Sequence, residues 1–217
     1  MPMRDALRQM DEGVVDPVEL GPEQLESSDV DLPEILGVLA HEFRNPLASL
    51  QGCAQTLLDR GDALAPDIRE RMTEVIVKHS QRLDWLMRAA AMFGGVGRRT
   101  DVEEVMLADV ARDACALTNA GIETASTAIV VGNEQRIQLA IEAVLMALGD
   151  RATVTVRGAV VEICSPERDL ARGSRSWKLH LASRVFRDEG ADVGAIVTSH
   201  GTCVTIRFRS IQGGSDE

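Results

Sequence analysis

A short stretch, HEFRNPLASLQG at residues 41–52, gathers side chains that can do chemistry. An imidazole such as that of His41 can serve as a nucleophile, a general base or a metal ligand. The carboxylate of Glu42 can accept a ring N–H, fix the tautomer and make the other ring nitrogen more nucleophilic. A zinc site of the H-E-x-x-H type needs a second histidine at position 45, which is Asn45. The pattern therefore favours a nucleophilic histidine over a metal ligand or an ordinary surface histidine.

Apolar residues around this stretch predict a long amphipathic helix from Asp31 to about Arg60, because they recur at steps of three, four or seven residues. They are Leu32, Leu36, Leu39, Phe43, Leu50, Ala54 and Leu57. At about 100° per residue they share one side of the helix, and His41 points to the opposite side, toward solvent. Pro46 removes one backbone hydrogen bond and is expected to bend the helix beyond the histidine.

The next residues predict a second helix and a helical hairpin. GDALAP at 61–66 supplies a glycine stop and a proline suited to a first helical turn, and FGG at 93–95 ends the next apolar pattern. Two such helices bury their stripes well by pairing with another hairpin, so we expect a dimeric four-helix bundle. His79 lies in the apolar register of the second helix without a neighbouring acid, so we expect it to pack or to lie on the bundle surface.

Beyond Asp101 the pattern changes to alternating helices and strands, which predicts an α/β domain. We expect helices near 107–119, 134–148 and 176–188, a strand from Thr127, and hairpins at 152–164 and 192–210. The fold class is therefore α+β, a helical hairpin followed by an α/β domain. The predicted divisions are an acidic, flexible leader at 1–30, the hairpin at 31–95, a linker at 96–101, the α/β domain at 102–211 and a tail at 212–217.

Composition narrows the range of partners and environments. The net charge of -11 comes without a basic stripe, which argues against nucleic acid and for a protein partner. No segment has the apolar span of a membrane helix or the form of a signal peptide, so we expect a cytoplasmic chain. The cysteines lie far apart without C-x-x-C spacing, which predicts reduced, mostly buried thiols rather than a zinc site. They are Cys53, Cys115, Cys164 and Cys203.

The stretch HEFRNPLASLQG resembles the H-box of the dimerisation and histidine-phosphotransfer domain of bacterial two-component sensor histidine kinases. That pattern is H-E, an aliphatic residue or Phe, Arg or Lys, Asn or Thr, then P-L, and QRLDWLMRAAAMF at 81–93 resembles the end of the domain's second helix. The resemblance implies that His41 is the phosphoacceptor and Glu42 its acid/base partner. It also implies that Asn45 positions water for dephosphorylating a response regulator and that Pro46 marks a helix bend.

The surface around His41 is expected to receive the partner. Ala48 and Gly52 lie on the same outer side of the helix as the imidazole, and they leave that side nearly bare of side-chain bulk. Arg44 lies next to them in the motif. We take Arg44, Ala48 and Gly52 as the candidate docking residues.

The second domain is similar in element order to the GHKL-type ATP-binding sandwich of such kinases, which implies a mixed sheet with helices on one face. NEQRIQLAIEAVLMAL at 133–148 resembles that family's D-x-x-R-L-x-Q-V-L-x-N-L-L-x-N-A helix. Its two asparagines fall on Ala143 and Ala147, the second of which would hold magnesium. Alanine offers no oxygen to a hard cation.

Further departures affect the nucleotide-binding loops. The strand VVEIC at 160–164 continues as SPERDLARGS instead of D-x-G-x-G, and about a dozen residues separate Cys164 from Trp177 where the family has a lid ending in G-x-G-L-G. RGSRSWK at 172–178 is either a solvated basic turn or an anion-binding segment. The resemblance is therefore to a degenerate ATP-binding domain, and we expect ATP binding to be lost.

The leading hypothesis is a dimeric histidine phosphotransferase that carries a phosphoryl group on His41 between receiver aspartates of response regulators, with a hybrid histidine kinase upstream. The receiver would supply Mg²⁺, and we expect no cofactor or metal bound by this chain. Two alternatives remain. One is an ATP-dependent autokinase with a diverged nucleotide site. The other is a non-catalytic pseudokinase scaffold, with or without phosphatase activity through Glu42 and Asn45.

Overall fold

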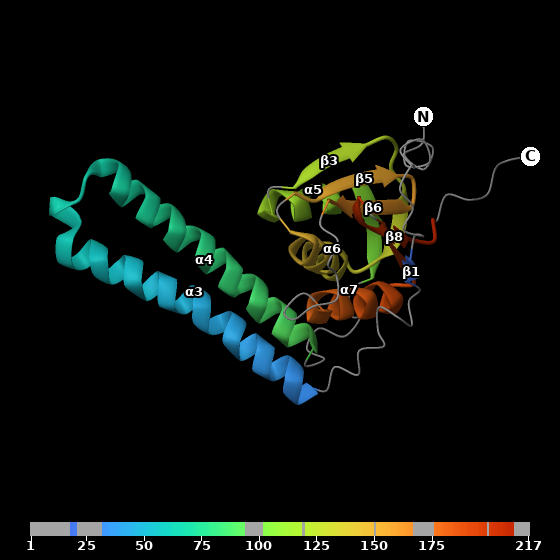
Figure 1. The fold of residues 1–217 in the computed structure, drawn as a ribbon. Coiled ribbons are helices and arrows are strands. Elements are labelled where there is room, and N and C mark those ends of the chain that lie inside the picture. Colours follow the sequence, from blue (N-terminus) through green and yellow to red (C-terminus); the bar gives the residue numbers. More distant parts are fainter. Residues whose placement is uncertain are drawn as a thin grey trace, which may run out of the picture. The chain divides into compact units, whose positions relative to one another are not determined.

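The computed structural model shows two compact units, and each is described by itself (Figure 1). One unit spans Asp29–Thr100, and the other combines Met1–Ser28 with Asp101–Glu217. The residues described below are 18–20, 32–93, 102–118, 120–149, 151–166, 176–198 and 200–210. In this part of the chain, every helix is too short or too polar to span a bilayer.

The first unit is a helical hairpin, as expected. Helix α3 (Leu32–Arg60) and helix α4 (Pro66–Phe93) are joined by a short 3-10 turn, η1 (Gly61–Ala63). Pro66 occupies the first turn of α4, where its missing N–H costs no hydrogen bond. Leu39 is buried, whereas Ala54 is exposed. Ala54 lies about 60° from Leu39 around the helix, at the edge of the stripe rather than at its centre.

The second unit contains a six-stranded sheet in the order β1-β7-β8-β6-β5-β3 and a two-stranded sheet, β2-β4. The strands are β1 (Val18–Leu20), β2 (Glu103–Met106), β3 (Gly121–Thr124), β4 (Ile129–Gly132), β5 (Thr153–Arg157), β6 (Val160–Ser165), β7 (Asp192–Thr198) and β8 (Gly201–Arg207). The helices are α5 (Leu107–Thr118), α6 (Glu134–Leu148) and α7 (Ser176–Asp188). The β3–β5 pair is parallel and the other pairs are antiparallel, so the large sheet is mixed.

The three helices cover one face of the large sheet (Figure 1). Alternate residues of the central strands are buried, as a sheet with one covered face requires. The buried apolar residues of β5, β6, β7 and β8 are Val154, Val156, Val161, Ile163, Val193, Ala195, Val204 and Ile206. This arrangement confirms the expected fold class, a helical hairpin followed by an α/β sandwich with helices on one face.

Three strands were not predicted, and one of them lies within the acidic leader at 1–30. Val18–Leu20 form β1, which pairs with β7 in antiparallel register at the sheet edge. The pairing satisfies backbone groups that an uncovered edge strand would present to solvent. The other residues of the leader, the linker at 96–101 and the tail at 212–217 lie outside the described residues.

The cysteines also differ from expectation. Cys164 of β6 and Cys203 of β8 are directly opposite each other in the antiparallel ladder and form a disulfide. The prediction of reduced thiols was wrong for this pair because it relied on sequence spacing, and 39 residues separate two cysteines that the sheet makes neighbours. Cys53 and Cys115 are free, and Cys115 is buried.

Removing the disulfide should destabilise the α/β unit. For a closed loop of 39 residues, the chain-entropy model gives a loss of about 4 kcal/mol in the free energy of unfolding. We expect this loss for Cys164→Ser/Cys203→Ser in urea titrations that follow Trp177 fluorescence in a Trp85→Phe background. Cys53→Ser is the control and should change the free energy of unfolding by less than about 0.5 kcal/mol. Equal stability of the double variant and the control would contradict the cross-link.

Candidate functional site

The structure places the predicted nucleophile on an exposed surface of α3. His41 is exposed, and so are Arg44, Asn45, Ala48 and Gly52, which follow it along the helix. His41, Asn45, Ala48 and Gly52 are separated by four, three and four positions, so they lie on one side of the helix. A partner can approach the imidazole across the small side chains of Ala48 and Gly52.

Packing within the hairpin does not require a glycine at position 52. A methyl group built at this position would meet nothing within 4 Å. Its carbonyl accepts a hydrogen bond of 2.8 Å from the Thr56 hydroxyl, an interaction that any residue at this position could make. The hairpin therefore tolerates a larger residue here, and the open space at Gly52 is available to another molecule.

Glu42 faces the neighbouring helix. Its Oε2 lies 2.6 Å from a guanidinium nitrogen of Arg82 on α4, and its side chain is 11% exposed. The structure therefore pairs this carboxylate with Arg82, and the contact with the ring of His41 stays a prediction. A charge-assisted hydrogen bond of this length fixes the carboxylate more firmly than a neutral one would.

Arg82 is the residue that sequence reasoning missed. Its guanidinium carbon lies 5.1 Å from the ring centroid of Trp85, one turn further along α4, so the ring supports the cation from one side. No local motif marks Arg82, because its partner Glu42 is 40 positions away in the chain. The one available signal is the opposite charge of two residues that meet when the two helices pair.

Pro46 lies inside α3, which continues on both sides of it, and the proline is buried. It supplies no N–H to the carbonyl of Glu42, four residues earlier. The Ser49 hydroxyl donates to the Asn45 carbonyl at 3.2 Å. Backbone hydrogen bonding is therefore altered within the turn that carries Glu42 and Asn45, and the bend itself stays a prediction.

In the α/β unit, the two positions that correspond to the family's asparagines face the interior. Ala143 and Ala147 on α6 are both fully buried. Glu142 beside them is also buried, and its Oε1 accepts a hydrogen bond of 2.8 Å from Gln138. Across the described residues, no group of three or more His, Cys, Asp or Glu side chains could hold a metal ion.

Ion pairs hold the start of α6 to the end of α7. Arg136 contacts Glu189 at 2.6 Å and Asp188 at 2.9 Å. The other oxygen of Glu189 accepts the Asn133 N–H at 2.9 Å, and the Asn133 side chain caps α6 by accepting from the Arg136 N–H. Polar side chains of the domain itself therefore fix the beginning of this helix.

The last three residues of RGSRSWK form the start of α7. Trp177 and Lys178 are both buried, and the Lys178 ammonium lies 4.9 Å from the Trp177 ring centroid. The part of RGSRSWK that includes Lys178 is therefore not a solvated turn. Its earlier residues, 172–175, lie outside the described residues.

Comparison with known proteins agrees with this geometry. Residues 33–88 match the model of the His Kinase A (phospho-acceptor) domain. The histidine kinase AdeS of Acinetobacter baumannii aligns over 80% of this chain and 98% of its own, with 14% identity and a TM-score of 0.51. A bacterial phosphotransferase aligns over 83% of this chain and 97% of its own, with 12% identity and a TM-score of 0.50. At these identities the likeness shows a shared fold. The comparison with curated proteins found no match.

The Glu42–Arg82 pair should stabilise the hairpin measurably. A double-mutant cycle with Glu42→Gln and Arg82→Gln, followed by Trp85 fluorescence in a Trp177→Phe background, should give a coupling energy of about 1 kcal/mol, because the pair is largely shielded from water. The exposed Asp84–Arg88 pair on the same helix is the control, with an expected coupling of about 0.3 kcal/mol. Equal coupling in the two pairs would contradict a special role for Glu42–Arg82.

Proposed function

Residues 33–88 of this chain belong to the His Kinase A (phospho-acceptor) family, and from this premise we propose that the protein is a histidine phosphotransferase of two-component signalling. His41 carries a phosphoryl group between receiver aspartates of response regulators. One observation carries the proposal. His41 is exposed on the hairpin, whereas fully buried alanines, Ala143 and Ala147, occupy the positions at which the related ATP-binding helix has asparagines.

The reaction requires this chain mainly to position the imidazole of His41. A ring nitrogen of His41 attacks the phosphorus of an aspartyl phosphate in line, the bond from phosphorus to the aspartate oxygen breaks, and the carboxylate leaves. The reverse step delivers the group to a second receiver. Positioning and charge neutralisation dominate phosphoryl transfer, and the receiver's own Mg²⁺ supplies the neutralisation. The chain then needs neither ATP nor a metal of its own.

Glu42 and Asn45 assist His41 in different ways. Glu42 is the acid/base partner of the imidazole, and Arg82 keeps its carboxylate in place at 2.6 Å. Asn45 is exposed one turn beyond His41, where its amide can orient water for dephosphorylating a bound receiver. Arg44, Ala48 and Gly52 form the docking surface for the receiver domain.

A second copy of the chain completes the bundle. Leu47 is 45% exposed and Leu58 is 81% exposed on α3, and Ala40 and Ala54 are exposed as well. Successive separations of 7, 7 and 4 residues place all four on one side of the helix, beside the stripe that faces α4 and away from His41. This second apolar side is the expected homodimer contact.

Phosphoryl transfer to His41 is the first test. When the protein is mixed with a receiver domain that carries a radiolabelled aspartyl phosphate, the wild type should acquire acid-labile label. His41→Gln should acquire none, because the nucleophile is absent. His79→Gln is the matched control on the same hairpin and should label like the wild type.

The same assay separates the alternatives. Label from ATP at His41 without a receiver would instead identify an autokinase. Absence of label from both donors, with folding unchanged, would favour a scaffold. In the phosphatase form of that role, Asn45→Ala should slow the loss of phosphate from the receiver.

The dimer is tested separately. Leu58→Glu places a charge in the proposed contact and should weaken dimerisation by at least about tenfold in sedimentation equilibrium. Val131→Glu, at a 44% exposed residue of the α/β unit, is the control and should leave the dimer intact. Unchanged dimerisation of Leu58→Glu would exclude this side of α3 as the contact.

A further inference from the structure

The large sheet has an outer face opposite its helices, and the strand register arranges that face in rows. One row contains Thr153, Cys164, Cys203 and Ile196, from β5, β6, β8 and β7. The next row is Thr155, Glu162, Thr205 and Gly194, and the third is Arg157, Val160, Arg207 and Asp192. The disulfide therefore lies in the middle of the face, with Thr153 on one side and Ile196 on the other.

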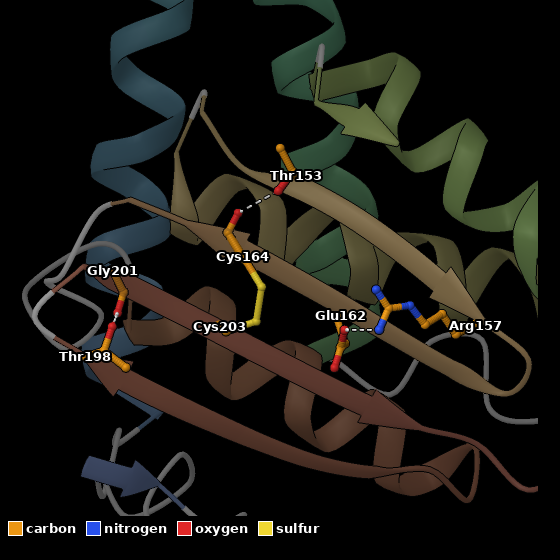
Figure 2. The surroundings of a disulfide bond; sticks show 7 residues. All are labelled: Thr153, Arg157, Glu162, Cys164, Thr198, Gly201 and Cys203. Atoms are coloured by element: carbon orange, nitrogen blue, oxygen red, sulfur yellow. Dashed lines mark hydrogen bonds and ion pairs between the residues drawn. A yellow bond between two sulfur atoms is a disulfide. The ribbon is translucent and has the colours of Figure 1, made fainter. Parts of the chain in front are cut away.

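The face is hollowed above the disulfide. A pocket of about 490 Å³ lies over β5–β8, and both half-cysteines line it. Figure 2 shows the Cys164–Cys203 bond between adjacent strands, on the same face as Arg157 and Glu162. Gly194, opposite Thr205 in the neighbouring row, contributes no side chain to fill this surface. A small molecule can therefore reach the sulfur atoms from this side.

More basic than acidic side chains line the pocket, although the protein as a whole is strongly acidic. Three guanidinium groups, of Arg151, Arg157 and Arg207, line it with one carboxylate, that of Glu162, whereas the chain carries a net charge of -11. Glu162 lies 3.9 Å from Arg157, so it offsets that cation in part. Within the described part of the chain, no ion pair forms at Arg151 or Arg207. A concave surface with this balance attracts anions.

The arginines lie at the two ends of the disulfide. Arg151 precedes Thr153 by two residues, and Arg207 follows Cys203 by four. Since Thr153 and Cys203 are in one row, and a strand rises about 3.4 Å per residue, Arg207 lies about 14 Å along β8 from the disulfide, and Arg151, in the turn before β5, lies on the opposite side of it. Arginine side chains can extend inward from both ends toward carboxylates that flank a central sulfur.

We propose that Cys164 and Cys203 form a reversible redox site for a small anionic peptide thiol of the glutathione class, which binds in this pocket with its carboxylates toward Arg151 and Arg207. Such a thiol carries its sulfur between two terminal carboxylates. An extended tripeptide is about 10 Å long, so both arginine side chains must extend inward along the sheet to meet its two ends. This inference does not depend on the proposed phosphotransfer.

The thiol–disulfide exchange has two steps. The thiolate of the bound peptide attacks the sulfur of one half-cysteine, a mixed disulfide forms, the Cys164–Cys203 bond breaks, and the other cysteine leaves as a thiolate that takes up a proton. A second peptide thiolate attacks the peptide sulfur of the mixed disulfide, the bond to the protein sulfur breaks, and that cysteine leaves as a thiolate that also takes up a proton. The products are the protein dithiol and the oxidised peptide dimer, and the reverse sequence restores the cross-link.

The two free cysteines lack these features. Burial raises the pKa of the Cys115 thiol to about 11, so its reactive thiolate is scarce at neutral pH. Cys53 is on the helical hairpin, outside this pocket. Reactivity selective for an anionic thiol is expected at Cys164 and Cys203 and not at the other two positions.

The test compares thiols of different charge on the full-length protein. Opening of the disulfide by glutathione, by neutral 2-mercaptoethanol and by cationic cysteamine is followed by alkylation and mass spectrometry, with rates expressed per thiolate. At low salt, glutathione should react about tenfold faster than the neutral thiol, and cysteamine should react slowest. Arg151→Ser/Arg207→Ser should reduce the preference for glutathione at least threefold.

The matched control is Arg71→Ser/Arg112→Ser, which removes the same charge from exposed positions outside the pocket and should keep the preference. Equal preferences in the two double variants, or a disulfide that glutathione does not open in the folded protein, would overturn the proposal. If the cysteines are isolated as thiols, oxidised glutathione becomes the probe. A mixed disulfide at Cys164 or Cys203, with the same dependence on Arg151 and Arg207, is then required.

Discussion

The pairing of α3 with α4 along one apolar stripe determines the role of each residue of the HEFRNPL motif. Leu39 and Pro46 are buried within α3, and Glu42 lies beside the stripe, close enough for Arg82 to reach it at 2.6 Å. His41 and Asn45 are turned away from α4 by the geometry of a helix with 3.6 residues per turn. One packing constraint therefore exposes His41 and anchors Glu42 beside it.

The framework of the α/β unit depends on contacts among its own side chains. The start of α6 is held by Arg136, whose partner Glu189 is fully buried, and by the cap of Asn133. A buried carboxylate of this kind is stable only while its cation and hydrogen bonds are present. Ala143 and Ala147 fill the interior of the same helix with methyl groups. The start of α6 is thus fixed by polar contacts, and its interior is fixed by apolar packing.

The sequence predicted the long elements because each has a regular apolar period. The helices around His41 and in the α/β unit, and the two closing hairpins, are of this kind. Strands β1, β2 and β3 have three or four residues each, which is too short for an apolar period to be visible in the sequence. Val18–Leu20 form a strand because they can pair with the edge of β7. That edge exists only in the folded sheet, so the residues themselves give no signal of the strand.

Contacts between residues far apart in the sequence could not be predicted either, because they too depend on the folded structure. The contacts of Glu42 with Arg82 and of Cys164 with Cys203 join residues 40 and 39 positions apart, and neither pair has a local signature. The exposed motif could be predicted because its residues are neighbours on one helix. The residues that support it could not, because they meet only after the chain has folded.

The two faces of the large sheet show how the strand period separates tasks within one domain. Inward residues such as Val204 and Ile206 are apolar and support the helices, whereas their neighbours Cys203, Thr205 and Arg207 lie on the outer face. A substitution at an outer position changes this surface without removing a core side chain. The outer face can therefore acquire a basic pocket and a cross-link while the helix-covered face keeps the fold, and its chemistry can differ from that of His41 on the hairpin.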